Sequence, residues 1–142
     1  MNTQSNISGS TLQSYRETDF LVYGSIPMTL RVGESNLDLM RLQQTEREQT
    51  SAFITACNPL GQIVEDAVNA DRQAGLAREL EARNLTFIPG VGQHPSNEWP
   101  GEASFLVLGL SLEAAKALGA KYEQNAIVWC GSDGVAQLVL LR

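Results

Sequence analysis

Short apolar runs separated by turn residues make up most of the hydrophobic pattern of this chain. The run at residues 52–57 (AFITAC) stops at Asn58-Pro59, and an apolar run of this length that ends in a turn is typical of a buried strand. A helical pattern follows, from residue 61 or 62 to about residue 83. Binding and catalytic sites often lie at the C-terminal end of such a strand, so the pattern predicts a site near the turn after residue 57.

Further apolar runs predict the other strands. They cover residues 20–23, 28–32, 85–88, 104–110, 125–130 and 135–141. The first two form a predicted hairpin, and so do the last two, which Asp133-Gly134 connects. The strand 85–88 is expected to end at Pro89-Gly90-Val91-Gly92, and residues 93–101 are expected to form a surface loop.

Two further helices are predicted from their capping residues. Ser35 is the expected N-cap of a short helix, with Asp38 in the capping-box position. Ser111 is the expected N-cap of a helix that ends near Gly119, and residues 11–16 are expected to form a helical turn. The resulting order, ββαβαββαββ, predicts an α/β (or α+β) fold. We expect a single domain at residues 15–142 with a mixed sheet, about three helices packed on it and a C-terminal hairpin, after a flexible tail at residues 1–14.

Composition narrows the functional classes without selecting one. The chain has 142 residues, 43% of them hydrophobic and 18% charged, which is typical of a globular domain. Its net charge of −6 makes nucleic acid an unlikely partner, because phosphates would be repelled. The sequence has no apolar run long enough to span a membrane and no signal-peptide pattern, so we expect a cytoplasmic protein. The oligomeric state is left open.

Familiar catalytic and cofactor-binding motifs are absent from the sequence. It has no GxGxxG, no P-loop and no GxSxG, and Gly90-Val91-Gly92 is explained by a turn. One histidine and two cysteines do not have zinc-site spacing. Cys57 and Cys130 fall in apolar runs, so we expect free buried thiols; a disulfide would require neighbouring strands. No metal and no cofactor are expected.

Polar residues at predicted strand ends and on the long helix are the remaining candidates for a site. They are Asn58, Asn69, Arg72, Trp99, Glu102 and Gln124, and Asn125 lies beside Gln124 at the start of the same predicted strand. Amides, a guanidinium, a carboxylate and an indole together suit a polar ligand. Each also has a purely structural interpretation: Asn58 as a turn cap, Trp99 as a cover for the core edge and Gln124 as a partner for strand ends. Arg72 alternatively snorkels or pairs with Glu65, Glu79 or Glu102.

Several of these residues lie in segments that resemble a bacterial family, domain of unknown function 3293. The segments are Phe53–Pro59, Asn69 with Arg72, Gly90–Gly92, Trp99–Gly109 and Gln124–Trp129, within a resemblance from about Tyr15 to Leu141. Cys57 and Tyr122-Glu123 depart from the residues that we expect in the family. The resemblance implies a small cytoplasmic bacterial protein, and it supplies no reaction, ligand or catalytic residue.

Three functions from different classes therefore remain. The first is a binding domain for a small polar or anionic ligand, in which Arg72 holds the anion, Asn58, Asn69 and Gln124 donate hydrogen bonds, and Trp99 stacks. The second is an interaction module of the inhibitor, immunity or adaptor type, which uses its acidic surface to bind a protein partner. The third is a small enzyme with Glu102 as general acid or base and Arg72 as charge stabiliser.

Overall fold

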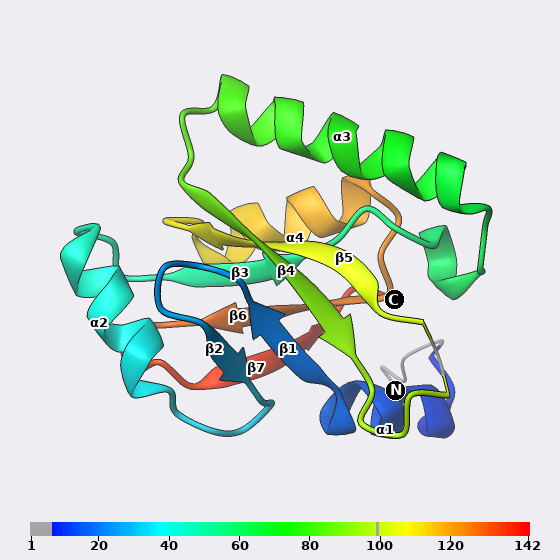
Figure 1. The fold of residues 1–142 in the computed structure, drawn as a ribbon, viewed down its shortest axis with the longest axis horizontal. Helices are drawn as coiled ribbons and strands as arrows, with labels where there is room; N and C mark the ends of the chain where they lie inside the picture. The colour runs from blue at the N-terminus through cyan, green and yellow to red at the C-terminus, as the bar shows by residue number, and fades with distance from the viewer. Residues whose placement is uncertain (1–6, 99) are drawn as a thin grey trace, which may run out of the picture.

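The computed structural model describes residues 7–98 and 100–142. Within them the helices are α1 (Gly9–Glu17), α2 (Leu37–Thr45), α3 (Asp66–Ala82) and α4 (Leu112–Lys121), and Pro59–Gly61 forms a short 3-10 turn, η1. The strands are β1 (Asp19–Val22), β2 (Met28–Leu30), β3 (Ser51–Ile54), β4 (Phe87–Gln93), β5 (Glu102–Leu108), β6 (Ala126–Cys130) and β7 (Ala136–Leu140). They form one sheet in the order β2-β1-β4-β5-β3-β6-β7 (Figure 1).

Two interlocked crossovers organise the sheet. The connection β3-α3-β4 leaves β5 between its two strands, and β5-α4-β6 leaves β3 between its two strands. This is the β-α-β-β-α-β arrangement of ferredoxin-like folds, extended by β1 and β2 at one edge and by β7 at the other. The α/β class, the single domain and the C-terminal hairpin β6–β7 are confirmed. The expected mixed sheet differs in one respect: every pair of named strands is antiparallel, because each crossover encloses an antiparallel strand.

A hydrophobic core lies on each face of the sheet. On one face, Leu76 and Leu80 of α3 and Leu118 of α4 pack on β3, β5 and β6. On the other face, Leu39 of α2 packs against strand residues that include Phe53. Figure 1 shows α3 and α4 together on one side and α1 and α2 away from them. All four residues of β3 are buried because this strand contributes to both cores, as the uninterrupted apolar run predicted.

Strand β4 is longer than the sequence predicted. The segment Pro89-Gly90-Val91-Gly92, which we expected to end the strand, lies inside it. A Cβ on Gly90 would clash with the backbone oxygen of Leu21 and lie 2.9 Å from the Phe53 ring. The glycine therefore permits close packing within the sheet rather than a turn.

Helices α2 and α3 start one to five residues later than predicted, whereas Ser111 caps α4 as predicted. Asn36, not Ser35, caps α2, since its Oδ1 accepts a hydrogen bond from the backbone N–H of Leu39 at 2.9 Å. Helix α3 begins at Asp66 because residues 58–65 form η1 and a loop. Both differences follow from local backbone geometry that the apolar periodicity does not encode.

Helix α1 covers the second half of the segment at residues 1–14 that we expected to be a flexible tail. It begins at Gly9, and the Ser8 side chain caps it by accepting a hydrogen bond from the Thr11 backbone N–H at 3.2 Å. Residues 1–6 of that predicted tail lie outside the described residues. Across residues 7–98 and 100–142, no helix has the length and apolarity needed to cross a membrane.

Candidate functional site

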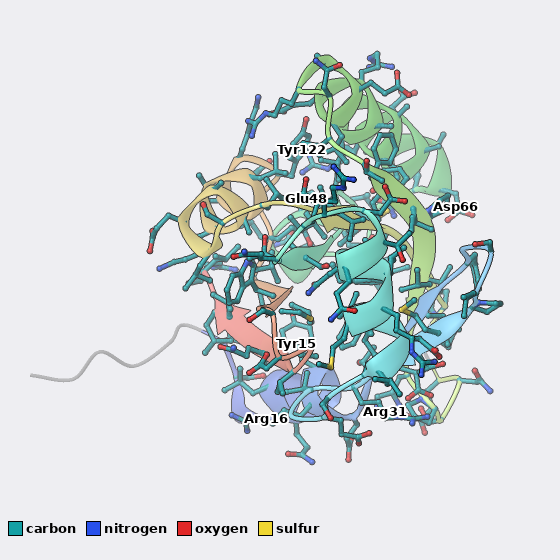
Figure 2. The ribbon with its side chains drawn as sticks, turned by 90° about the vertical axis from the view of Figure 1, so that its left-hand side faces the viewer. Tyr15, Arg16, Arg31, Glu48, Asp66 and Tyr122 are labelled. Carbon is teal, nitrogen blue, oxygen red and sulfur yellow. The ribbon has the colours of Figure 1, made fainter. Side chains whose placement is uncertain are left out.

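A cleft of about 990 Å³ lies at the end of the sheet where β3 and β4 finish and β5 and β6 begin. Helix α1 and the first turns of α3 also line it. Figure 2 shows Tyr15 on the side of α1 that faces the sheet, whereas Arg16 points away from it. The sheet end after residue 57, where the strand–turn–helix pattern predicted a site, therefore borders the cleft.

Three residues in register form part of the cleft floor. Phe20 of β1 is opposite Gly92 of β4, and Gly92 is opposite Glu102 of β5. Directly opposed residues of an antiparallel sheet share a face, so these three positions all face the cleft, which each of them lines. Gly92 carries no side chain, so in this row no side chain of β4 lies between Phe20 and Glu102.

Apolar side chains line other parts of the cleft. Phe20 and Phe53 pack edge to face, with ring centroids 5.2 Å apart. Leu60 and Ile63, in the segment between β3 and α3, are 42% and 76% exposed. The cleft thus combines a polar end with apolar walls, a combination common in small-ligand sites.

Asn58 is the centre of a hydrogen-bond network at the polar end. Its backbone is left-handed (φ 48°, ψ 66°), a conformation that asparagine tolerates better than most residues. Its backbone N–H donates to Asn69 Oδ1 at 2.8 Å, and its Oδ1 accepts from Asn69 Nδ2 at 2.9 Å and from the Val64 N–H at 3.2 Å. Its Nδ2 donates to Glu102 Oε2 at 2.8 Å. The network therefore attaches the turn that follows β3 both to helix α3 and to strand β5.

Glu102 is a half-buried carboxylate without a cationic partner among the described residues. Its one hydrogen-bond donor there is the neutral amide of Asn58. Burial raises the pKa of Glu102 because it disfavours the charged form, and the Asn58 hydrogen bond only partly opposes this shift. The ion pair with Arg72 that we considered from sequence does not form. Glu102 therefore has hydrogen-bonding capacity at the cleft surface.

Arg72 joins two backbone segments next to the cleft. Its Nε donates to the Ala56 carbonyl at 2.6 Å and its Nη2 donates to the Tyr122 carbonyl at 2.7 Å. Its Nη1 lies 3.5 Å from Glu123 Oε1. Arg72 is not among the residues that line the cleft. Its guanidinium connects the end of β3 to the loop between α4 and β6.

Gln124 reinforces the same connection and also lines the cleft. Its Nε2 donates to the Cys57 carbonyl at 3.0 Å and to the Tyr122 carbonyl at 3.1 Å. Of the six residues predicted from sequence, Asn58, Asn69, Glu102 and Gln124 thus meet at one cleft and Arg72 lies behind it. Trp99 lies outside the described residues.

Beyond these six residues, the polar residues that line the cleft include Tyr15, Gln73, Asn125 and Arg142. Asn125 Nδ2 donates to the Tyr15 hydroxyl at 3.2 Å, and Arg142 Nη1 donates to Asn125 Oδ1 at 2.6 Å. Burial raises the pKa of Tyr15, and the nearby Glu102 carboxylate adds to the shift. Tyr15 and Arg142 come from opposite ends of the chain, so no local sequence signal connects them.

Gln73 is one helical turn after Asn69, and that i,i+4 spacing is a signal that could have identified it. Its Oε1 accepts a hydrogen bond from the Ala56 N–H at 3.0 Å, which fixes the orientation of the amide. Its Nε2 is buried and has no hydrogen-bond partner among the described residues. A buried donor of this kind is uncommon and suits a site that a ligand or water completes.

Both cysteines are free and buried, as the apolar runs predicted. Burial raises the pKa of the Cys57 thiol, and it raises the pKa of Cys130 to about 12. Cys57 Sγ lies 3.5 Å from the Ala103 carbonyl, to which it donates. These thiols are protonated at neutral pH, which does not favour a cysteine nucleophile. The described residues contain no cluster of three or more His, Cys, Asp or Glu side chains that could hold a metal ion.

A family model described as "Protein of unknown function (DUF3293)" matches residues 54–127, just over half of the chain. The chain therefore belongs to this family, as its motifs indicated. The matched region runs from the end of β3 to the start of β6 and contains Asn58, Asn69, Glu102 and Gln124. It is shorter than the range over which we saw the resemblance, and it excludes Tyr15 and Arg142. No curated protein and no solved structure matches the chain.

Proposed function

We propose that this protein is a small-ligand-binding domain whose cleft at the sheet end takes a polar ligand. The observation that carries the proposal is Glu102, a half-buried carboxylate at the cleft floor that is held by a neutral amide and lacks a cation among the described residues. A charged or polar group removed from water is costly unless it is hydrogen-bonded, so a ligand donor would stabilise this arrangement.

The buried Nε2 of Gln73 supports the same proposal. It offers a hydrogen-bond donor on α3, whereas Glu102 offers an acceptor on β5. In this proposal Asn58 and Asn69 hold Glu102 and the turn in place, and Gln124 fixes the loop beside them. Arg72 supports the cleft from behind, so an anion held by its guanidinium is not the arrangement that its contacts favour.

The test is a thermal-shift screen of polar metabolites against the wild-type protein and Gly92→Val. A Cβ at Gly92 would meet its nearest atoms at 3.8 Å, in ordinary contact, so the valine narrows the cleft floor without a clash of its Cβ with the fold. Gly75→Ala, on α3 and outside the cleft, is the matched control. Hits that stabilise the wild type and Gly75→Ala but not Gly92→Val support the proposal, because a ligand stabilises only the state that it binds. No hits, or equal shifts in all three proteins, would contradict it.

The raised pKa of Glu102 favours an enzyme as the second candidate function. A carboxyl group whose pKa is moved toward neutrality can act as general acid or base, and the Tyr15 hydroxyl is close enough to sense its charge. If this candidate is right, a screening hit is converted by the wild-type protein and left unchanged by Glu102→Gln, although both proteins bind it. Conversion that is equal in both proteins would exclude Glu102 as the catalytic group.

A further inference from the structure

The chemical class of the ligand follows from the charge at the cleft floor, and this inference rests on the proposed function. The Glu102 side chain accepts one hydrogen bond, from an uncharged amide, and forms no ion pair within residues 7–98 and 100–142. Asp66, at the start of α3 (Figure 2), is a second carboxylate that lines the cleft. A cationic donor is the ligand group that best offsets a partly desolvated carboxylate.

The basic groups of the cleft do not take this role. Arg142 donates to Asn125 on β6, and His94 lies against Glu17 of α1, with His94 Nε2 3.1 Å from Glu17 Oε1. Neither forms an ion pair with Glu102. Within the described part of the chain, the Glu102 charge is therefore left for the ligand to neutralise.

The register of the sheet specifies what lies next to that charge. The backbones of Glu102 and Phe20 are two strand spacings, or about 10 Å, apart with Gly92 between them, and the Phe20 ring lies 3.8 Å from the position that a Gly92 Cβ would occupy. Phe53 packs against Phe20 at the far end of this path. A group bound at Glu102 would thus continue over a glycine onto two aromatic rings, and an apolar chain suits that path.

We infer that the ligand is a primary amine with an apolar body, whose ammonium group donates to Glu102 and whose apolar part lies over Gly92 against Phe20 and Phe53. The exposed Leu60 and Ile63 provide further apolar surface along the cleft. A free alkylamine and a lysine side chain on another protein share this chemistry.

Calorimetric titration with hexylamine, hexanol and hexanoate tests the inference. We expect hexylamine to bind the wild-type protein, hexanol to bind at least about tenfold more weakly because it lacks the charge-assisted hydrogen bond, and hexanoate not to bind. Glu102→Gln should weaken hexylamine binding by a similar factor while keeping an acceptor for Asn58. The matched control is Glu113→Gln, because Glu113 is on the far helix α4 and its side chain is 83% exposed. It should bind like the wild type.

Equal binding of hexylamine and hexanol, or equal binding of hexylamine by Glu102→Gln and the wild type, would overturn the inference. Gly92→Val provides a second test that leaves the Glu102 carboxylate intact, and this variant should also bind hexylamine more weakly than the wild type does. Tighter binding of Nα-acetyl-lysine methylamide than of hexylamine identifies a protein lysine as the source of the ammonium, and weaker binding identifies a free amine. If polar metabolites bind in the cleft but no amine binds, the amine inference is wrong and the proposed function still stands. If Gly92→Val weakens the binding of no ligand, the proposed function is wrong as well.

Discussion

Asn58 Nδ2 donates a hydrogen bond to Glu102 Oε2 at 2.8 Å, across 44 positions of sequence. The bond connects the turn after β3 to the first residue of β5. The same asparagine holds Asn69 of α3, so one side chain links three elements around the cleft.

Replacement of Asn58 separates its side-chain role from its backbone role. Asn58→Ala loses the side-chain hydrogen bonds and places alanine in a left-handed conformation, so we expect a loss of about 2–4 kcal/mol in the free energy of unfolding. Asn58→Gly loses the same side-chain hydrogen bonds, but glycine adopts the left-handed backbone conformation without strain. Its loss in the free energy of unfolding should therefore be smaller than that of Asn58→Ala. Urea denaturation of both variants measures the difference. Equal losses would show that the backbone conformation contributes nothing.

Glu102 makes the free energy of unfolding depend on pH, in a direction that its raised pKa defines. Its pKa is higher in the folded protein than in the unfolded chain, so its ionisation disfavours folding. The stability that protonated Glu102 contributes is fully present below the pKa of Glu102 in the unfolded chain. It is lost as the pH rises through the pKa of Glu102 in the folded protein. Glu102→Gln should therefore be more stable than the wild type at pH 7, and this advantage should disappear toward about pH 4. Urea denaturation at several pH values tests this; a constant difference would contradict it.

The two glycines of β4 should respond differently to the same substitution. Gly90→Ala forces a Cβ against the Leu21 carbonyl and the Phe53 ring, and we expect it to destabilise the fold by about 2–3 kcal/mol. Gly92→Ala meets nothing closer than 3.8 Å and should change stability by less than about 1 kcal/mol. Thermal denaturation of the pair provides its own control. Similar melting temperatures for the two variants would contradict the packing that we assign to Gly90.

Arg72 should matter for stability rather than for direct ligand contact. Arg72→Met leaves the Ala56 and Tyr122 carbonyls without its hydrogen bonds, and we expect a loss of about 2–4 kcal/mol. Arg78→Met, at an exposed position of α3, is the matched control and should be close to neutral. Titration of a cleft ligand into folded Arg72→Met should give nearly the wild-type affinity. A selective loss of affinity without a loss of stability would return Arg72 to the binding site.

Local patterns in the amino-acid sequence are enough to predict the order of the strands and helices from β1 to β7 and the end of the sheet at which the polar residues gather. Apolar runs and capping residues are local signals, and the buried strand at residues 52–57 was visible because β3 is covered on both faces. The prediction of a turn at residues 89–92 is wrong, because a glycine that close packing against a neighbouring strand requires looks the same in sequence as a glycine that a turn requires.

Which polar residues share the cleft depends on long-range packing and not on local sequence patterns. Asn58, Asn69, Glu102 and Gln124 were within reach of sequence reasoning because each is near an element end, whereas Tyr15 and Arg142 were not, since contacts between chain ends leave no local pattern. The structure also separated Arg72 from the cleft: periodicity places it on an arc of α3, but hydrogen bonds to two distant carbonyls decide its direction. The register across β1, β4 and β5 places Gly92 between Phe20 and Glu102, and this register is set by strand pairing that no single segment encodes.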